Sequence, residues 1–180
     1  MAGASLILPF LPMLPQQILL TNFLTDFPYM SVASDSVDED LLTIPHKWDI
    51  KRLKHFMIVF GLHSSIFDFL TFFALYKLFH ADEDLFHTGW FIESISTELL
   101  ILFVVRTHKP LIKSMPGKFL LILSAIALVI TLLLPFMPFA TMLGLVVPPL
   151  QLLLTMLGIL ILYVITADIL KVIFFRKKIK

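Results

Sequence analysis

The chain has 180 residues, of which 58% are hydrophobic and only 15% are charged, and its mean hydropathy is +0.94. A soluble domain is nearer about 45–50% apolar, so the composition excludes an ordinary soluble protein and indicates an integral membrane protein. The absence of cysteine excludes a disulfide framework and a cysteine metal site. The expected partner is therefore a lipid bilayer and not a nucleic acid, while the formal net charge of +1 by itself says little.

The N-terminal stretch is apolar and interrupted by prolines. Pro9, Pro12 and Pro15 recur at every third position, and proline is tolerated at a helix start but not in a helix interior. The sequence therefore predicts the end of one helix in Met1–Leu8, followed by a tight extended turn. No positively charged segment precedes the apolar residues, so a secretory signal peptide is not expected.

Five apolar segments that could cross a bilayer follow. A membrane helix needs about 20 predominantly apolar residues. The predicted spans are residues 15–33, 56–79, 88–105, 119–136 and 150–175. The whole chain, 1–180, is thus predicted to be one all-α membrane domain, a bundle of about five transmembrane helices.

The basic residues are distributed unevenly along the chain. Twelve of the 14 Lys and Arg residues fall within three segments: 47–54, 106–118 and 176–180. Five spans would place these three segments on one side of the membrane, and the positive-inside rule makes that side cytoplasmic. The sequence therefore predicts a cytoplasmic C-terminus.

The first predicted span contains three polar residues within its apolar run. Asn22, Thr25 and Asp26 stand at positions i, i+3 and i+4, which places them within about 60–100° of arc on a helix. An ionisable group inside a membrane helix costs about 2.5–3.5 kcal/mol or more, so it normally faces protein, a partner or an ion. Amide, hydroxyl and carboxylate oxygens suit hard cations such as Mg²⁺ or Ca²⁺. The alternative is that these side chains only hold neighbouring helices together.

Further ionisable residues lie inside the later spans. Asp68 is interpreted either as a structural acid or as an acid near an ion path. Glu93 and Glu98 project about 140° apart on a helix, so they cannot both face one neighbour squarely. Asp168 is three residues before Lys171, a spacing that predicts a local ion pair.

Pro15–Asp26, PQQILLTNFLTD, resembles the sixth transmembrane helix of P-type cation-transporting ATPases. The resemblance continues through Lys47–Asp49, Ser64–Asp68 and Gly89–Glu93, and it is similar in particular to the magnesium-transporting branch. In that family the Asn and Asp of this helix help to bind the transported ion. The resemblance implies metal-ligand roles for Asn22, Thr25 and Asp26, with Glu98 as a further ligand. The functional interpretation of Asp68 is an acid in the second shell around the ion.

The resemblance also implies a parent protein and a transported ion. The five spans would correspond to helices 6–10 of an ATP-driven ion translocase in the plasma membrane. The partner would be the rest of that ATPase, its helices 1–5 and its cytoplasmic domains. Mg²⁺ is the expected ion. Thr25 is nearer to the pattern of the calcium and proton pumps, which leaves Ca²⁺ and H⁺ open.

The sequence lacks the motifs with which these pumps use ATP. It contains no DKTG-like, TGE-like or GDG-like segment and no Walker A sequence. No nucleotide site is therefore expected, and the chain is expected to be an inactive C-terminal fragment of a pump. The alternative is a free-standing five-span structural or regulatory membrane protein without transport activity.

Overall fold

The computed structural model describes residues 8–35 and 50–176 of the chain. Within these ranges every regular element is a helix and no strand occurs, which confirms the predicted all-α fold. The long helices are α1 (Pro15–Ser31), α3 (Ile50–Phe73), α4 (Glu83–Val105), α5 (Lys118–Leu133) and α6 (Leu150–Arg176). The predicted end of a preceding helix, Met1–Leu8, lies outside the described residues except for Leu8.

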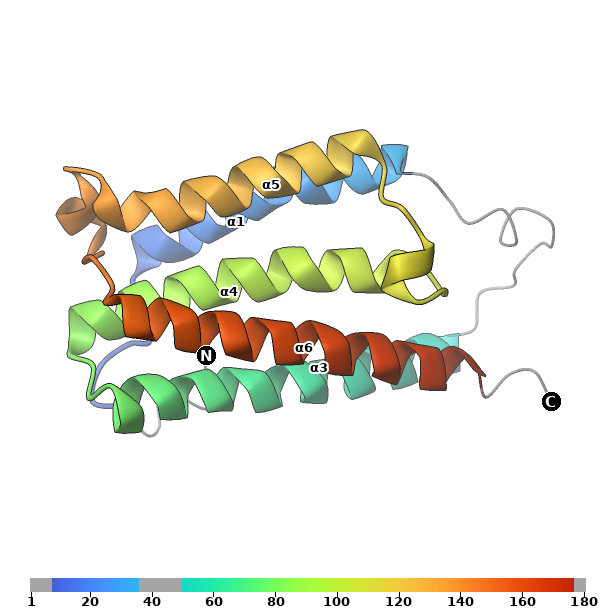
Figure 1. Cartoon of the computed structure of the whole chain (residues 1–180), viewed down its shortest axis with the longest axis horizontal. Helices are drawn as coiled ribbons and strands as arrows, with labels where there is room; N and C mark the ends of the chain where they lie inside the picture. The colour runs from blue at the N-terminus through green and yellow to red at the C-terminus, as the bar shows by residue number, and fades with distance from the viewer. Residues whose placement is uncertain (1–7, 36–49, 177–180) are drawn as a thin grey trace.

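The five helices run along one common direction, with α4 between two pairs (Figure 1). Helix α1 packs against α5 on one side of α4, and α3 packs against α6 on the other side. Inside the bundle, 61% of an apolar 18-residue window of α4 is buried. The corresponding share for the windows of α3, α5 and α6 is 28–33%. Helix α4 is therefore the core of the bundle, and the outer helices leave broad apolar surfaces for lipid.

Within the described residues, four helices are long and apolar enough to cross a membrane. They are Ile50–Leu78, which includes a π-helical extension of α3, Glu83–Val105, Lys118–Phe136, which includes a 3-10 extension of α5, and Leu150–Phe175. Helix α1 has 17 residues with Pro28 inside it, and it contacts α4 and α5 within the same bundle. The chain is therefore an integral membrane protein.

Two helices begin earlier than their apolar segments suggest. Helix α3 begins at Ile50 and not at Phe56, because lysine and arginine are good helix formers and the basic stretch continues the helix. Helix α4 begins at Glu83 and not at Thr88. The Leu85 backbone N–H donates to Asp82 Oδ1 at 3.0 Å, which caps the helix.

The start of α1 is attached to the connection between α5 and α6. The buried Gln17 side chain donates to the backbone carbonyls of Leu143 and Gly144 at 2.9 and 3.2 Å. Gly144 has φ +66°, and a Cβ there would lie 2.5 Å from Leu14 Cδ1. Glycine therefore permits both the left-handed turn and the close approach of α1.

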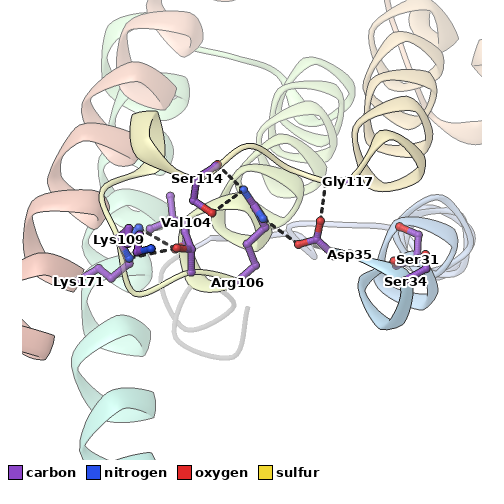
Figure 2. A network of polar contacts seen from close by, with 10 residues as sticks. Ser31, Ser34, Asp35, Val104, Arg106, Lys109, Ser114, Gly117 and Lys171 are labelled. Carbon is purple, nitrogen blue, oxygen red and sulfur yellow. Dashed lines mark hydrogen bonds and ion pairs between the residues drawn. The ribbon is translucent and has the colours of Figure 1, made fainter. Parts of the chain in front are cut away.

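At the other end of the bundle, Arg106 joins three helices (Figure 2). Arg106 Nη1 donates to Asp35 Oδ2 at 2.9 Å, and the two side chains are only 2% and 7% exposed. Arg106 Nη2 donates to the Ser114 carbonyl, and the Gly117 backbone N–H donates to Asp35 Oδ1. The ends of α1 and α4 are thereby held to the start of α5.

A second ion pair at this end joins α6 to the same connection. The buried Lys171 Nζ lies 2.7 Å from Asp168 Oδ1, which confirms the predicted local pair, and it donates to the Val104 carbonyl at 3.0 Å. The Leu111 backbone N–H also donates to Asp168 Oδ1, at 3.0 Å. We call the two pairs, Asp35–Arg106 and Asp168–Lys171, the α4–α5 clasp.

Most of the described basic residues lie at the clasp end of the bundle, whereas Lys77, in the π-helical extension of α3, lies at the other end. The start of α3, the α4–α5 connection and the end of α6 all lie there (Figure 1). The residues are Lys51, Arg52, Lys54, Arg106, Lys109, Lys113 and Lys118. Lys47 and residues 177–180, which belong to the same predicted basic segments, lie outside the described residues.

Candidate functional site

The three polar residues predicted on one face of α1 have different surroundings. Thr25 is buried, whereas Asn22 and Asp26 are exposed on the outer side of the helix. Thr25 Oγ1 donates to the Thr21 carbonyl at 3.1 Å, a bond within the helix that leaves the lone pairs of the hydroxyl oxygen available. Thr25 thus faces the bundle, and the other two side chains face away from it.

Helix α4 brings a second carboxylate to this part of α1. The half-buried Glu98 carboxyl lies within hydrogen-bonding reach of the Thr25 and Tyr29 hydroxyls, and it interacts electrostatically with Asp26. Tyr29 is a residue that the sequence reasoning missed. Its position, three residues after Asp26 and four after Thr25, was the available signal, because those spacings share a helix face. We call Asn22, Thr25, Asp26, Tyr29 and Glu98 the α1–α4 site.

Asp68 does not join this site. It lies between α3 and α4, where it interacts electrostatically with Glu93 and with Tyr163 of α6. The groups that act on Glu98 come from α1 and do not include Asp68. The electrostatic neighbours of Glu98 and of Asp68 therefore differ, although Tyr163, which interacts with Asp68 and Glu93, also interacts with Tyr29.

The α1–α4 site is open on one side. Among residues 8–35 and 50–176, no three His, Cys, Asp or Glu side chains gather closely enough to hold a metal ion, whereas Mg²⁺ requires about six oxygen ligands. Asn22 and Asp26 share the exposed side of α1 with the apolar residues Leu19, Phe23, Phe27 and Met30. Lipid would be a poor cover for the Asp26 carboxylate because hydrocarbon does not solvate charge. The exposed side of α1 is therefore suited to contact with a further polypeptide segment.

Two histidines inside the bundle have structural partners. His63 Nε2 lies 2.8 Å from Thr166 Oγ1, which joins α3 to α6. His87 Nε2 lies 2.6 Å from the carbonyl of Leu11, which holds the segment before α1 against α4. Both histidines therefore join segments of the bundle to one another.

Comparison with known proteins places this architecture in a family. The family model "Cation transporting ATPase, C-terminus" matches residues 10–173. The chain is 39% identical over 153 residues to the "Magnesium-transporting ATPase, P-type 1" of Escherichia coli (strain K12), which covers 82% of this chain and 17% of that protein. It is 36% identical over 179 residues to a protein of the same name from Salmonella typhimurium (strain LT2), covering 97% of this chain and 20% of that protein.

The chain thus spans about a fifth of the length of these relatives. The family match extends over nearly all of the described helices, and both relatives align with the helical bundle. The comparisons do not favour a free-standing structural protein. The chain belongs to the family of C-terminal membrane regions of P-type cation-transporting ATPases, on the magnesium-transporting branch.

Proposed function

We propose that the chain supplies part of the intramembrane cation site of a P-type ATPase, and that the transported ion is Mg²⁺. The proposed ligands are Asn22, Thr25, Asp26 and Glu98. The observation that supports the proposal is that the half-buried Glu98 of α4 interacts with Thr25 and, electrostatically, with Asp26, both of α1. Asn22, one helical turn before Asp26, adds an amide oxygen on the exposed side of α1.

The electrostatics of the α1–α4 site favour a cation. Glu98 is half-buried and Asp26 is exposed on the outer side of α1, and a cation bound near both carboxylates would reduce the repulsion between them. The hydroxyl and amide oxygens would replace part of the hydration shell of the ion, which Mg²⁺ gives up reluctantly. The names of the relatives support Mg²⁺ as the ion.

The remaining ligands would come from the N-terminal portion of the ATPase, which the relatives contain beyond the region aligned with this chain. In such a pump, ATP hydrolysis in the cytoplasmic domains would drive alternating access to the site. The role of this chain would be to hold half of the ligands on two packed helices. The exposed side of α1 would be the surface against which the earlier membrane helices dock.

The test is the cation dependence of ATP hydrolysis by the full-length ATPase that contains this chain. Glu98→Gln keeps the size of the side chain and removes a ligand charge, so half-maximal stimulation should require at least about tenfold more Mg²⁺, equivalent to about 1.4 kcal/mol of lost binding. Glu83→Gln, at the exposed start of the same helix, is the matched control and should leave the curve unchanged. An unchanged Mg²⁺ curve for Glu98→Gln would show that Glu98 is not a ligand of the site. Stimulation of ATP hydrolysis by Ca²⁺ alone would show that the transported ion is Ca²⁺ and not Mg²⁺.

We further infer that the clasp end of the bundle faces the cytoplasm of a cell whose plasma membrane holds the protein. The support is the gathering of basic residues at that end, together with the acidic turn 82–84 between α3 and α4 at the other end. A reporter fused after Lys180 should be active in the cytoplasm, and one inserted between Ala81 and Asp84 should be active outside. The reverse pattern of reporter activity would invert the proposed orientation.

A further inference from the structure

The start of α1 is held by a buried side-chain amide. Gln17 is completely buried. Its Nε2 donates to the carbonyls of Leu143 and Gly144 at 2.9 and 3.2 Å, and its Oε1 accepts from the Leu14 backbone N–H at 3.0 Å. An amide offers two donors on one side and an acceptor on the other, whereas a carboxylate offers no donor. The connection between α5 and α6 is therefore bonded to the first turn of α1 through one side chain of matching chemistry.

The α5–α6 connection is itself fixed to α4. The Val146 backbone N–H donates to Thr88 Oγ1 of α4 at 2.8 Å, and the neighbouring Leu145 is fully buried in the main hydrophobic core. The segment before α1 also reaches α4, because His87 Nε2 lies 2.6 Å from the Leu11 carbonyl. The connection thus bridges the starts of α1 and α4, at the end of the bundle opposite the clasp (Figure 1).

Gln17 lies on the same face of α1 as Thr25. Gln17, Thr21 and Thr25 follow one another at intervals of four, a spacing that places them on one side of a helix, and all three are buried. Thr25 lies about 12 Å further along the helix than Gln17. A rotation of α1 at Gln17 would therefore turn Thr25 away from the bundle and carry Asn22 and Asp26 with it.

Apolar packing gives little preference for one rotation of α1. The large apolar residues on its exposed side are Leu19, Phe23, Phe27 and Met30. Lipid chains are as apolar as these side chains, so burial does not favour one face of the helix as it would in water. Polar contacts must therefore fix the rotation. At the clasp end the contact is made by Asp35, which lies beyond the end of α1, whereas Gln17 belongs to the helix itself.

We propose that Gln17 is a positioning residue of the α1–α4 site. Its hydrogen bonds to the α5–α6 connection fix the rotation of α1, and this rotation decides that Thr25 faces the bundle while Asn22 and Asp26 face outward. Gln17 acts through those side chains and is not a ligand, because both ends of its amide are bonded to backbone groups. The effect on the cation rests on the proposed function, whereas the fixed rotation of α1 does not.

The orientation of α1 is measurable in this chain in lipid nanodiscs by electron paramagnetic resonance. The chain has no cysteine, so nitroxide labels attach only at two introduced cysteines, Leu19→Cys on α1 and Ile161→Cys on α6, both at exposed positions. With Gln17 in place, the distance between the two labels should have one narrow distribution. Gln17→Met keeps the length of the side chain and removes its hydrogen bonds, so it should broaden this distribution or shift its mean.

A second variant changes the other partner of the contact. Gly144→Val places a branched side chain at φ +66°, where a Cβ would lie 2.5 Å from Leu14 Cδ1, so the connection must move away from α1. It should change the distance distribution in the same direction with Gln17 intact. Gln151→Met, at the exposed start of α6, is the matched control and should leave the distribution unchanged.

The full-length ATPase gives the functional readout. Gln17→Met should raise the Mg²⁺ concentration for half-maximal ATP hydrolysis about threefold, less than Glu98→Gln does, because ligands are displaced and not removed. Gln151→Met should leave the curve unchanged. A merely structural role of Gln17 would lower the melting temperature without altering the Mg²⁺ dependence of the enzyme that remains folded.

The outcomes separate this proposal from the proposed function. An unchanged distance distribution in both Gln17→Met and Gly144→Val would overturn the positioning role, whatever the Mg²⁺ curves show. A wild-type Mg²⁺ curve for Gln17→Met would also overturn it if Glu98→Gln shifts the curve. A changed distribution together with wild-type curves for both Gln17→Met and Glu98→Gln would support the fixed rotation of α1 and overturn the proposed function instead.

Discussion

The α4–α5 clasp and the α1–α4 site both contain acidic side chains, but these side chains differ in burial and in their hydrogen-bond partners. In the clasp, Asp35 and Arg106 are almost completely buried and every carboxylate oxygen of Asp35 has a donor. In the α1–α4 site, Asp26 and Asn22 are exposed, and Asp26 interacts electrostatically with another carboxylate, Glu98. Acidic side chains are thus paired and largely buried in the clasp, whereas in the α1–α4 site they include an exposed one.

The difference separates polar groups that hold this chain together from polar groups that contribute little to its folding and that we propose bind a cation. A buried ion pair whose partners all come from one chain contributes to the integrity of that chain, because loss of one partner leaves an uncompensated charge. An exposed acid beside another acid contributes nothing comparable to folding. Substitutions in the clasp should therefore affect stability, and substitutions in the α1–α4 site should affect function.

The largest expected effect on stability is that of Arg106→Ala. The change leaves Asp35 buried without its cation, which should lower the free energy of unfolding by about 3–5 kcal/mol. Thermal unfolding of the chain in detergent, followed by circular dichroism, measures the loss. Lys113→Ala removes an exposed basic residue of the same connection and should stay within about 0.5 kcal/mol of the wild type. Equal stability of the two variants would show that the clasp is not structural.

The sequence predicted the parts of the structure that depend on local patterns. Apolar runs indicated the membrane helices, and the i, i+3 spacing indicated the Asp168–Lys171 pair, because both follow from the geometry of a single helix. The helix starts were predicted too late at α3 and α4, because hydropathy detects only the apolar part of a helix. Asp82, Glu83 and Asp84 were a readable capping signal for the earlier start of α4.

The contacts between distant residues could not be predicted in this way. Asp35 and Arg106 are 71 positions apart in the chain, and no periodicity relates them. Which groups interact with Glu93 and Glu98, among them Asp68 and Thr25, depends on how α4 is rotated between its neighbours. A helical wheel gives the angle between two side chains of one helix, but it does not say which neighbouring helix each of them meets.

Thr25→Val is expected to have a smaller effect, both on the stability of the chain and on the Mg²⁺ dependence of the ATPase. The hydroxyl donates only to its own helix backbone at Thr21, so its loss should change the free energy of unfolding by about 1 kcal/mol or less. If the hydroxyl oxygen is a cation ligand, the variant in the full-length ATPase should need more Mg²⁺ for half-maximal activity, although less than Glu98→Gln, because a neutral ligand is lost. A large loss of stability with unchanged Mg²⁺ dependence would show that Thr25 has a structural role and is not a cation ligand.

The most direct test of the contrast between the α1–α4 site and the clasp compares Asp26→Asn with Asp168→Asn. Both changes remove one carboxylate charge at constant size, the first in the α1–α4 site and the second in the clasp. ATP hydrolysis against Mg²⁺ concentration should be measured in the full-length ATPase at matched expression, together with thermal stability. Asp26→Asn should strongly weaken Mg²⁺-stimulated turnover with little change in stability, and Asp168→Asn should lower stability and leave the Mg²⁺ dependence nearly unchanged. Wild-type Mg²⁺ dependence in Asp26→Asn would contradict the account, because Asp26 would then only join helices and the open face of α1 would not be a transport site.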